Sequence, residues 1–116
     1  AIADYVQGRG GILGFEDLAR YEAIVSEPLR CEYHGAELFA CPGATGGPTQ
    51  IELANLMEAV LGEERFDESN LMHWHFLVEA LKIAWRDRLE HMDDPAFVPL
   101  PEWLLSKDYA NEAMAI

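Results

Sequence analysis

The sequence predicts an α+β fold, mostly helical, with one β-hairpin. Apolar residues recur every three to four positions between Leu71 and Leu89, which is the spacing of an amphipathic helix. Between Ile24 and Cys41 the period changes to two residues, which is typical of strands. The chain has 116 residues, half of them hydrophobic, so we expect residues 1–116 to form a single segment with one modest core.

The composition is strongly acidic and narrows the range of partners. The chain has 21 acidic residues against 8 basic ones, for a formal net charge of -13. This charge repels phosphate backbones and anionic lipid, so we expect no nucleic-acid and no membrane partner. The chain opens at Ala1 in a helical pattern without a signal peptide, and we therefore expect a segment cut from a longer protein.

Two short helices are expected before residue 24. The first covers Ala1–Gln7 and is closed by the turn that begins at Gly8. The second covers Phe15–Tyr21, where two early carboxylates suit a helix start. We expect Leu18 and Tyr21 to point inward from this second helix.

The hairpin is expected to turn at His34–Gly35, which places Cys31 opposite Leu38. One face of the hairpin then carries Leu29, Cys31, Tyr33, Ala36, Leu38 and Ala40. Cys41 falls on the opposite face from Cys31, so the register predicts no disulfide between them.

Residues 41–48 form a loop rich in Pro and Gly, and a helix follows it. Thr49 and Glu52 have the spacing of a capping box, and Gly62 is placed to end the helix. The side chains expected to be buried on this helix are Leu53, Leu56, Met57, Val60 and Leu61. The glycine-rich stretch Gly43–Gly47 has no Lys nearby, so we favour a structural turn over direct contact with an anionic ligand.

The longest helix is expected over Leu71–Met92, with the rest of the chain packed on it. Ser69 or Asn70 caps its start, and Pro95 prevents it from continuing past the region of Met92. Its expected buried face comprises Leu71, Trp74, Val78, Leu81 and Trp85, widened by Leu77, Ala84 and Leu89. After it we expect a short turn at residues 102–105 and a last helix from residue 107, capped by Ser106.

Charged residues near the end of the long helix are expected to form a clamp. Arg88 falls beside the apolar stripe, where a charged side chain needs a partner. Asp87, Asp93 or Asp94 could supply it, and the resulting ion pair would hold the turn at Pro95 onto the helix. Catalysis by this group is the less favoured alternative.

No metal site, cofactor site or catalytic residue is predicted. His75 and Glu79 share a helix face, but His73 points elsewhere and His91 is distant in sequence. The paired histidines of a zinc helix are missing. The serines, threonines and cysteines have no His and carboxylate at a diagnostic local spacing.

The ordered motifs of the chain resemble gamma-glutamyltranspeptidase, in the C-terminal part of the large subunit. The resemblance rests on Gly10-Gly11-Ile12-Leu13, Glu16-Asp17-Leu18, Tyr21, Glu27-Pro28-Leu29, Pro42, Gly46-Gly47, Glu79-Ala80, Asp87-Arg88, Asp94-Pro95-Ala96-Phe97-Val98 and Leu104-Leu105-Ser106-Lys107-Asp108-Tyr109-Ala110. It implies a place in the αββα sandwich of an N-terminal nucleophile hydrolase. It also implies an enzyme that cleaves itself to free a Thr, which takes the acyl group of a gamma-glutamyl amide and passes it to water or an amino acid.

The resemblance transfers a framework and no catalytic residue. The framework residues are Gly46, Gly47, Asp87, Arg88, Asp94 and Pro95. The family's nucleophile lies outside these residues, so we expect this segment alone to be inactive and to self-associate through uncovered apolar surface. Its implied partners are the remainder of the large subunit and the small subunit, and the implied location is periplasmic or extracellular.

One departure from the family pattern keeps other functions open. Where the family usually has a loop of the Pro-Pro-Ser-Ser-Gly-Gly type, this chain has Pro42-Gly43-Ala44-Thr45-Gly46-Gly47. An acylase relative acting on glutaryl or cephalosporin side chains is therefore an alternative. A non-catalytic helical interaction module, with the apolar stripe as its docking face, is the alternative from another class.

Overall fold

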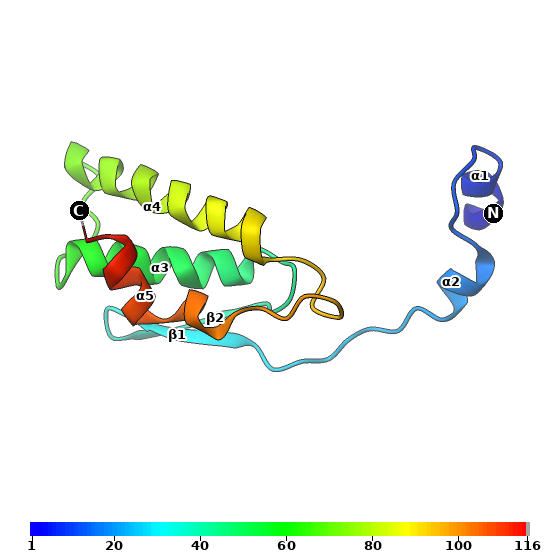
Figure 1. Ribbon diagram of the computed structural model, residues 1–116, viewed down its shortest axis with the longest axis horizontal. Coiled ribbons are helices and arrows are strands. Elements are labelled where there is room, and N and C mark those ends of the chain that lie inside the picture. Colours follow the sequence, from blue (N-terminus) through cyan, green and yellow to red (C-terminus); the bar gives the residue numbers. More distant parts are fainter. Residues whose placement is uncertain (116) are drawn as a thin grey trace.

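The computed structural model describes residues 1–115 and confirms the α+β class, with helices and one antiparallel hairpin (Figure 1). Ile116, the last residue of the predicted segment, lies outside the described residues. The elements in order are α1 (Ile2–Gln7), α2 (Phe15–Ala19), β1 (Leu29–Tyr33), β2 (Ala36–Ala40), α3 (Gly47–Leu61), α4 (Leu71–His91), the 3-10 helix η1 (Glu102–Leu105) and α5 (Lys107–Ala113). None of the helices over residues 1–115 has both the length and the apolar character needed to cross a membrane.

Helix α3, not α4, is the element around which the others pack. It contacts α4, α5, η1 and both strands, and it runs between α4 and the hairpin in Figure 1. A helix that is covered from several sides needs buried residues around most of its circumference. On α3 these are Gly47, Pro48, Ile51, Glu52, Asn55, Leu56, Met57 and Leu61. The expectation that the chain packs on α4 is therefore wrong.

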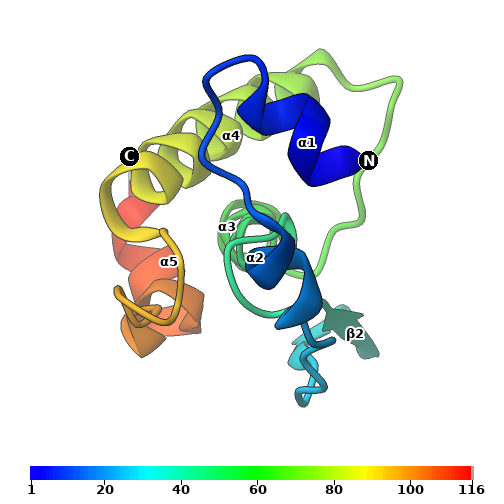
Figure 2. The ribbon, with the colours of Figure 1, turned by 90° about the vertical axis from the view of Figure 1, so that its right-hand side faces the viewer.

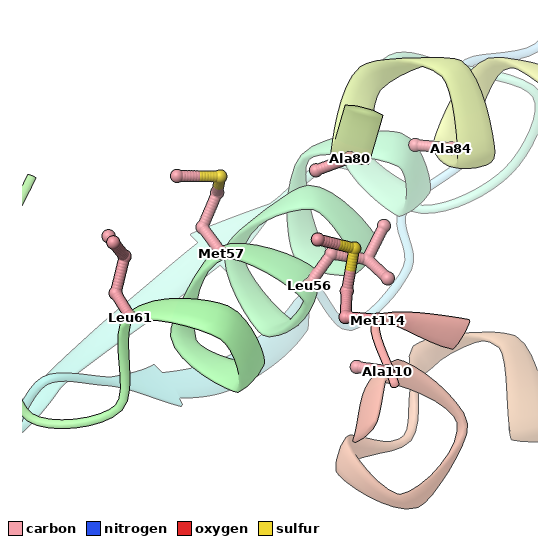
Figure 3. Packing of buried hydrophobic residues seen from close by; sticks show 7 residues of the cluster. All are labelled: Leu56, Met57, Leu61, Ala80, Ala84, Ala110 and Met114. Atoms are coloured by element: carbon pink, nitrogen blue, oxygen red, sulfur yellow. The ribbon is translucent and has the colours of Figure 1, made fainter. Parts of the chain in front are cut away.

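The core joins three helices (Figure 3). It consists of Leu56, Met57 and Leu61 from α3, Ala80 and Ala84 from α4, and Ala110 and Met114 from the C-terminal end of the chain. Large side chains of α3 thus meet alanines of α4 and α5, which allows the helix backbones to approach closely. Complete burial of a side chain such as Leu56 contributes about 1.5–3 kcal/mol, so this small cluster fixes how the helices pack.

Helix α4 presents its predicted apolar stripe to solvent. We call Leu71, Trp74, Val78, Leu81, Trp85 and Leu89 the α4 stripe, and each is exposed, by between 42% and 84% of its surface. The buried positions of α4 are His73, Ala80, Ala84 and Asp87. Of the flanking positions, Leu77 and Ala84 contact the core. Periodicity locates an apolar face but does not say which neighbour covers it, and here the small residues face α3.

The hairpin forms in the predicted register. Cys31 pairs with Leu38, and the remaining pairs follow from the same turn. His34 and Gly35 have φ values of 48° and 80°, which is the left-handed backbone of a type I′ turn. The alternating pattern began at Ile24, but strand pairing begins only at Leu29. The first strand is therefore shorter than the pattern suggested. Both cysteines are free.

The N-terminal arm, residues 1–28, extends away from the rest of the molecule (Figure 1). Figure 2 views the molecule from the end where α1 and α2 lie. Leu18 and Tyr21 are 41% and 81% exposed, so the expectation that they point inward is wrong within the described chain. Helix α2 ends at Ala19, short of the predicted Tyr21, with Arg20 as its C-cap.

Candidate functional site

The loop between β2 and α3 closes tightly on itself. The Thr45 hydroxyl donates to the Cys41 carbonyl oxygen at 2.7 Å and accepts from the Gly47 N–H at 3.1 Å. A Cβ atom on Gly47 would lie 1.9 Å from the same carbonyl oxygen. Only glycine therefore fits at position 47, because the backbone of Cys41 occupies the space of a side chain.

Helix α3 begins at Gly47, before the predicted cap. Pro48 stands in the first turn, where its fixed φ suits a helix and its missing N–H costs nothing. The earlier start moves Glu52 past the first turn, so the predicted capping box does not form. The Thr49 hydroxyl instead accepts from Arg88, and the Glu52 side chain is buried.

Arg88 ties the end of α4 to the start of α3. Its Nη1 donates to the Thr45 carbonyl oxygen at 2.6 Å and to Thr49 Oγ1 at 3.2 Å. The predicted clamp paired Arg88 with a carboxylate, and this is wrong: no ion pair of Arg88 occurs within residues 1–115. A guanidinium carries several donors, and a loop carbonyl and a hydroxyl use them here.

The Asp94–Pro95 turn closes by its own hydrogen bonds. Asp94 Oδ1 accepts from the Ala96 N–H at 2.9 Å, so this carboxylate is not the partner of Arg88. The Pro95 ring lies beside Gly43, where an added Cβ would sit 3.6 Å from Pro95 Cγ. The turn thus contacts the loop before α3 directly.

A groove of about 990 Å³ lies where these segments meet. It is lined by residues 24–26 and Pro28 of the arm, by residues 39–44, and by Asp94 and Pro95. The predicted framework residues Gly46, Gly47, Arg88, Asp94 and Pro95 are gathered at this end of the molecule.

Asp87 lies apart from the groove, on the buried side of α4, in a cluster with Glu52, Arg86 and Tyr109. Its Oδ1 accepts from Arg86 Nε at 2.7 Å, and its Oδ2 accepts from the Tyr109 hydroxyl. Arg86 Nη2 also donates to the Tyr109 oxygen at 3.1 Å. Burial and the neighbouring Asp87 raise the pKa of Glu52 to about 8 and that of Tyr109 to about 12.

Sequence reasoning missed Glu52 and Tyr109 as members of this buried cluster. For Glu52 a signal was present, because it precedes the core residue Leu56 by one helical turn and so shares its face. The capping-box pattern that begins at Thr49 offered a competing local explanation. Tyr109 carried no comparable signal, since its partner Asp87 is distant in sequence.

The hydroxyls of the loop and of the last helix serve structure. Those of Thr45 and Thr49 form the bonds described above, and Ser106 Oγ accepts from the Tyr109 N–H at the start of α5. Burial raises the pKa of the Cys31 thiol, which keeps it protonated and weakly nucleophilic. We assign no nucleophile within residues 1–115.

A metal site is not assigned either. Asp87, Glu90 and His91 approach one another closely enough to share an ion. Both Asp87 oxygens, however, already accept hydrogen bonds, one of them from a guanidinium whose charge opposes a cation. The described residues thus form a structural framework beside a groove.

Comparisons with known proteins match one family over nearly the whole chain. A family profile described as gamma-glutamyltranspeptidase matches residues 1–115. The chain is 36% identical to the acylase ACY 1 proenzyme of Pseudomonas sp. (strain SE83), over 100% of this chain and 21% of that protein. It is 33% identical to the glutathione hydrolase proenzyme of Escherichia coli (strain K12), over 95% of this chain and 19% of that protein.

Solved structures agree as well. The crystal structure of Helicobacter pylori gamma-glutamyltranspeptidase matches with a TM-score of 0.82 and 29% identity, over 97% of this chain and 33% of that chain. The chain thus spans about a fifth of the length of the curated relatives and a third of this solved chain.

Proposed function

Because the chain belongs to the gamma-glutamyltranspeptidase family, we propose that it forms part of the large subunit of an enzyme that cleaves gamma-glutamyl amides. In this proposal the acyl group passes to water or to an amino acid. The observation that carries it is the family match over residues 1–115. The nucleophilic Thr is assigned to the remainder of the precursor, because Thr45 and Thr49 form structural hydrogen bonds and the relatives are described as proenzymes.

The role of this segment in the enzyme is to hold the groove in shape. Gly47 permits the close turn before α3, and Arg88 fixes that turn to α4. Asp94 and Pro95 also line the groove, beside Gly43. Positioning of this kind matters in catalysis because displacements of about 1 Å can slow a reaction by roughly a hundredfold.

The remainder of the precursor is proposed to cover the apolar surface that this segment exposes. The α4 stripe is a contiguous row of large apolar side chains, and the groove is lined mainly by apolar residues. Exposed patches of this kind mark interaction sites in soluble proteins. About four fifths of the length of the relatives lies outside the matched region, which is ample chain to cover both surfaces.

An acylase is the second candidate function. Two observations favour it: the loop at Gly43–Thr45 departs from the usual family pattern, and an acylase proenzyme shares 36% identity. The loop borders the groove, so a change there can alter which acyl side chain is accepted.

The test is to express the precursor that contains this chain, look for self-cleavage, and sequence the new N-terminus. Cleavage before a Thr, with release of aniline from gamma-glutamyl anilide, is the result expected for the first proposal. Release from glutaryl anilide alone would favour the acylase. A precursor that neither cleaves itself nor turns over either anilide would overturn the enzymatic proposal. The non-catalytic interaction module would then be the favoured function.

A further inference from the structure

We propose that Glu52 is held as a neutral carboxylic acid that donates a hydrogen bond to Asp87, so that the two carboxyl groups share one proton and fasten α3 to α4. Glu52 lies on α3 and Asp87 on α4, and each is only 1% exposed. Asp87 is the acidic neighbour of Glu52 where α3 packs against α4. This inference does not depend on the proposed enzymatic activity.

The first argument is hydrogen bonding. Neither oxygen of Glu52 receives a hydrogen bond from the described residues. A buried carboxylate without a donor is strongly destabilising, since it loses its hydration and gains nothing in return. A proton changes this situation, because the acid then becomes a donor and Asp87 is a neighbouring acceptor.

The second argument is charge. The charged or titratable groups that act on Glu52 come from α4, as Arg86 and Asp87, and from α5, as Tyr109. Arg86 balances Asp87, so the cluster is neutral when Glu52 and Tyr109 keep their protons. Ionisation of Glu52 would leave a net negative charge on two carboxyl groups that are each only 1% exposed.

The consequence is that acid pH stabilises the joint between the helices. In the unfolded chain Glu52 has an ordinary pKa of 4.5, whereas burial and Asp87 raise its pKa to about 8 in the folded state. Between these values the folded state holds a proton that the unfolded state has released, so stability falls as pH rises. The unfolding equilibrium constant should rise by up to about tenfold per pH unit through this window and level off above it.

The experiment is a pH titration of the whole chain, with ¹³C label in the glutamate carboxyl groups and detection by NMR. One carboxyl carbon is expected to keep the shift of a protonated acid up to about pH 7, and this resonance should be missing from Glu52→Gln. Exposed Glu63 provides the control, because Glu63→Gln should leave this resonance in place.

Denaturation at several pH values gives the second readout. Gln at position 52 donates to Asp87 at every pH, so the unfolding constant of the wild type relative to Glu52→Gln should rise by up to about tenfold per pH unit between pH 5 and 8. Parallel curves for the two proteins would overturn the proposal. So would a wild-type spectrum in which every glutamate carbon titrates below pH 6, a result that stands even if the variant does not fold.

Discussion

Gly47 shows how one residue decides the geometry of the groove. Its neighbour Gly46 has open space around it and a φ of -73°, whereas a side chain on Gly47 would overlap the Cys41 carbonyl. We expect Gly47→Ala to lower the free energy of unfolding by roughly 2–3 kcal/mol, because backbone must move. Gly46→Ala is the matched control and should change it by less than about 1 kcal/mol. Urea denaturation followed by tryptophan fluorescence measures both, and equal losses would show that the close contact is not what position 47 requires.

Residues differ in how far the sequence reveals their role. The Gly46–Gly47 pair was predicted to form a structural turn, and the close approach to Cys41 explains why glycine stands there. The partner of Arg88 was not predictable, because sequence displays carboxylates but not the position of a loop carbonyl. Glu52 was misassigned because a capping-box pattern is local, and Pro48 had already moved the helix start.

At the scale of elements, Arg88 is expected to hold the C-terminal end of α4 against the start of α3. Arg88→Ala removes one hydrogen bond to the loop before α3 and one to α3 itself, and should lower the free energy of unfolding by about 1–2 kcal/mol. It should also speed amide exchange in residues 41–50, measured by mass spectrometry. Arg88→Lys keeps the charge but loses the planar guanidinium with its several donors. Its free energy of unfolding and its exchange rate should therefore lie between those of the wild type and Arg88→Ala.

Arg65 supplies the control for this prediction. It is exposed and lies in the connector between α3 and α4, so Arg65→Ala removes the same charge without touching the junction. Exchange in residues 41–50 should stay unchanged in that variant. If Arg65→Ala and Arg88→Ala accelerate exchange equally, net charge rather than the two hydrogen bonds controls the loop.

Elements were predicted more reliably than the contacts between them. The hairpin register and the Ser106 cap of α5 are confirmed. Of the two predicted caps of α4, Asn70 is the one that forms, and α4 ends at His91, one residue before the predicted Met92. Each depends on local chemistry: a turn that needs left-handed backbone, a side-chain acceptor, or a proline. The orientation of α4 depends instead on which surface its neighbours offer, and no local pattern carries that information.

At the scale of the molecule, an elongated body carries apolar surface that its own residues do not cover. The molecule measures 55 × 28 × 24 Å, with the arm at one end. The arm leaves Ile12, Phe15 and Tyr21 largely exposed, and the α4 stripe runs along the other part. A helix at the surface of a globular protein normally buries its apolar stripe against a neighbour. The α4 stripe therefore requires another protein surface to cover it.

This requirement predicts that the isolated chain self-associates through the α4 stripe. Light scattering should show oligomers that dissociate on dilution through the micromolar range. Leu81→Glu places a charge within the stripe and should shift dissociation to at least about tenfold higher concentration, since burying an unpaired charge costs more than the roughly 1.4 kcal/mol that a tenfold change requires.

Phe97→Glu separates the α4 stripe from a general effect of charge. Phe97 is 82% exposed but lies outside α4, so this variant adds the same charge elsewhere. It should leave the oligomer intact. A monomeric wild type would show that the stripe does not drive association. Equal dissociation by both variants would assign the effect to net charge, which is already -13. The proposal that the rest of the precursor covers the α4 stripe would then lose its support.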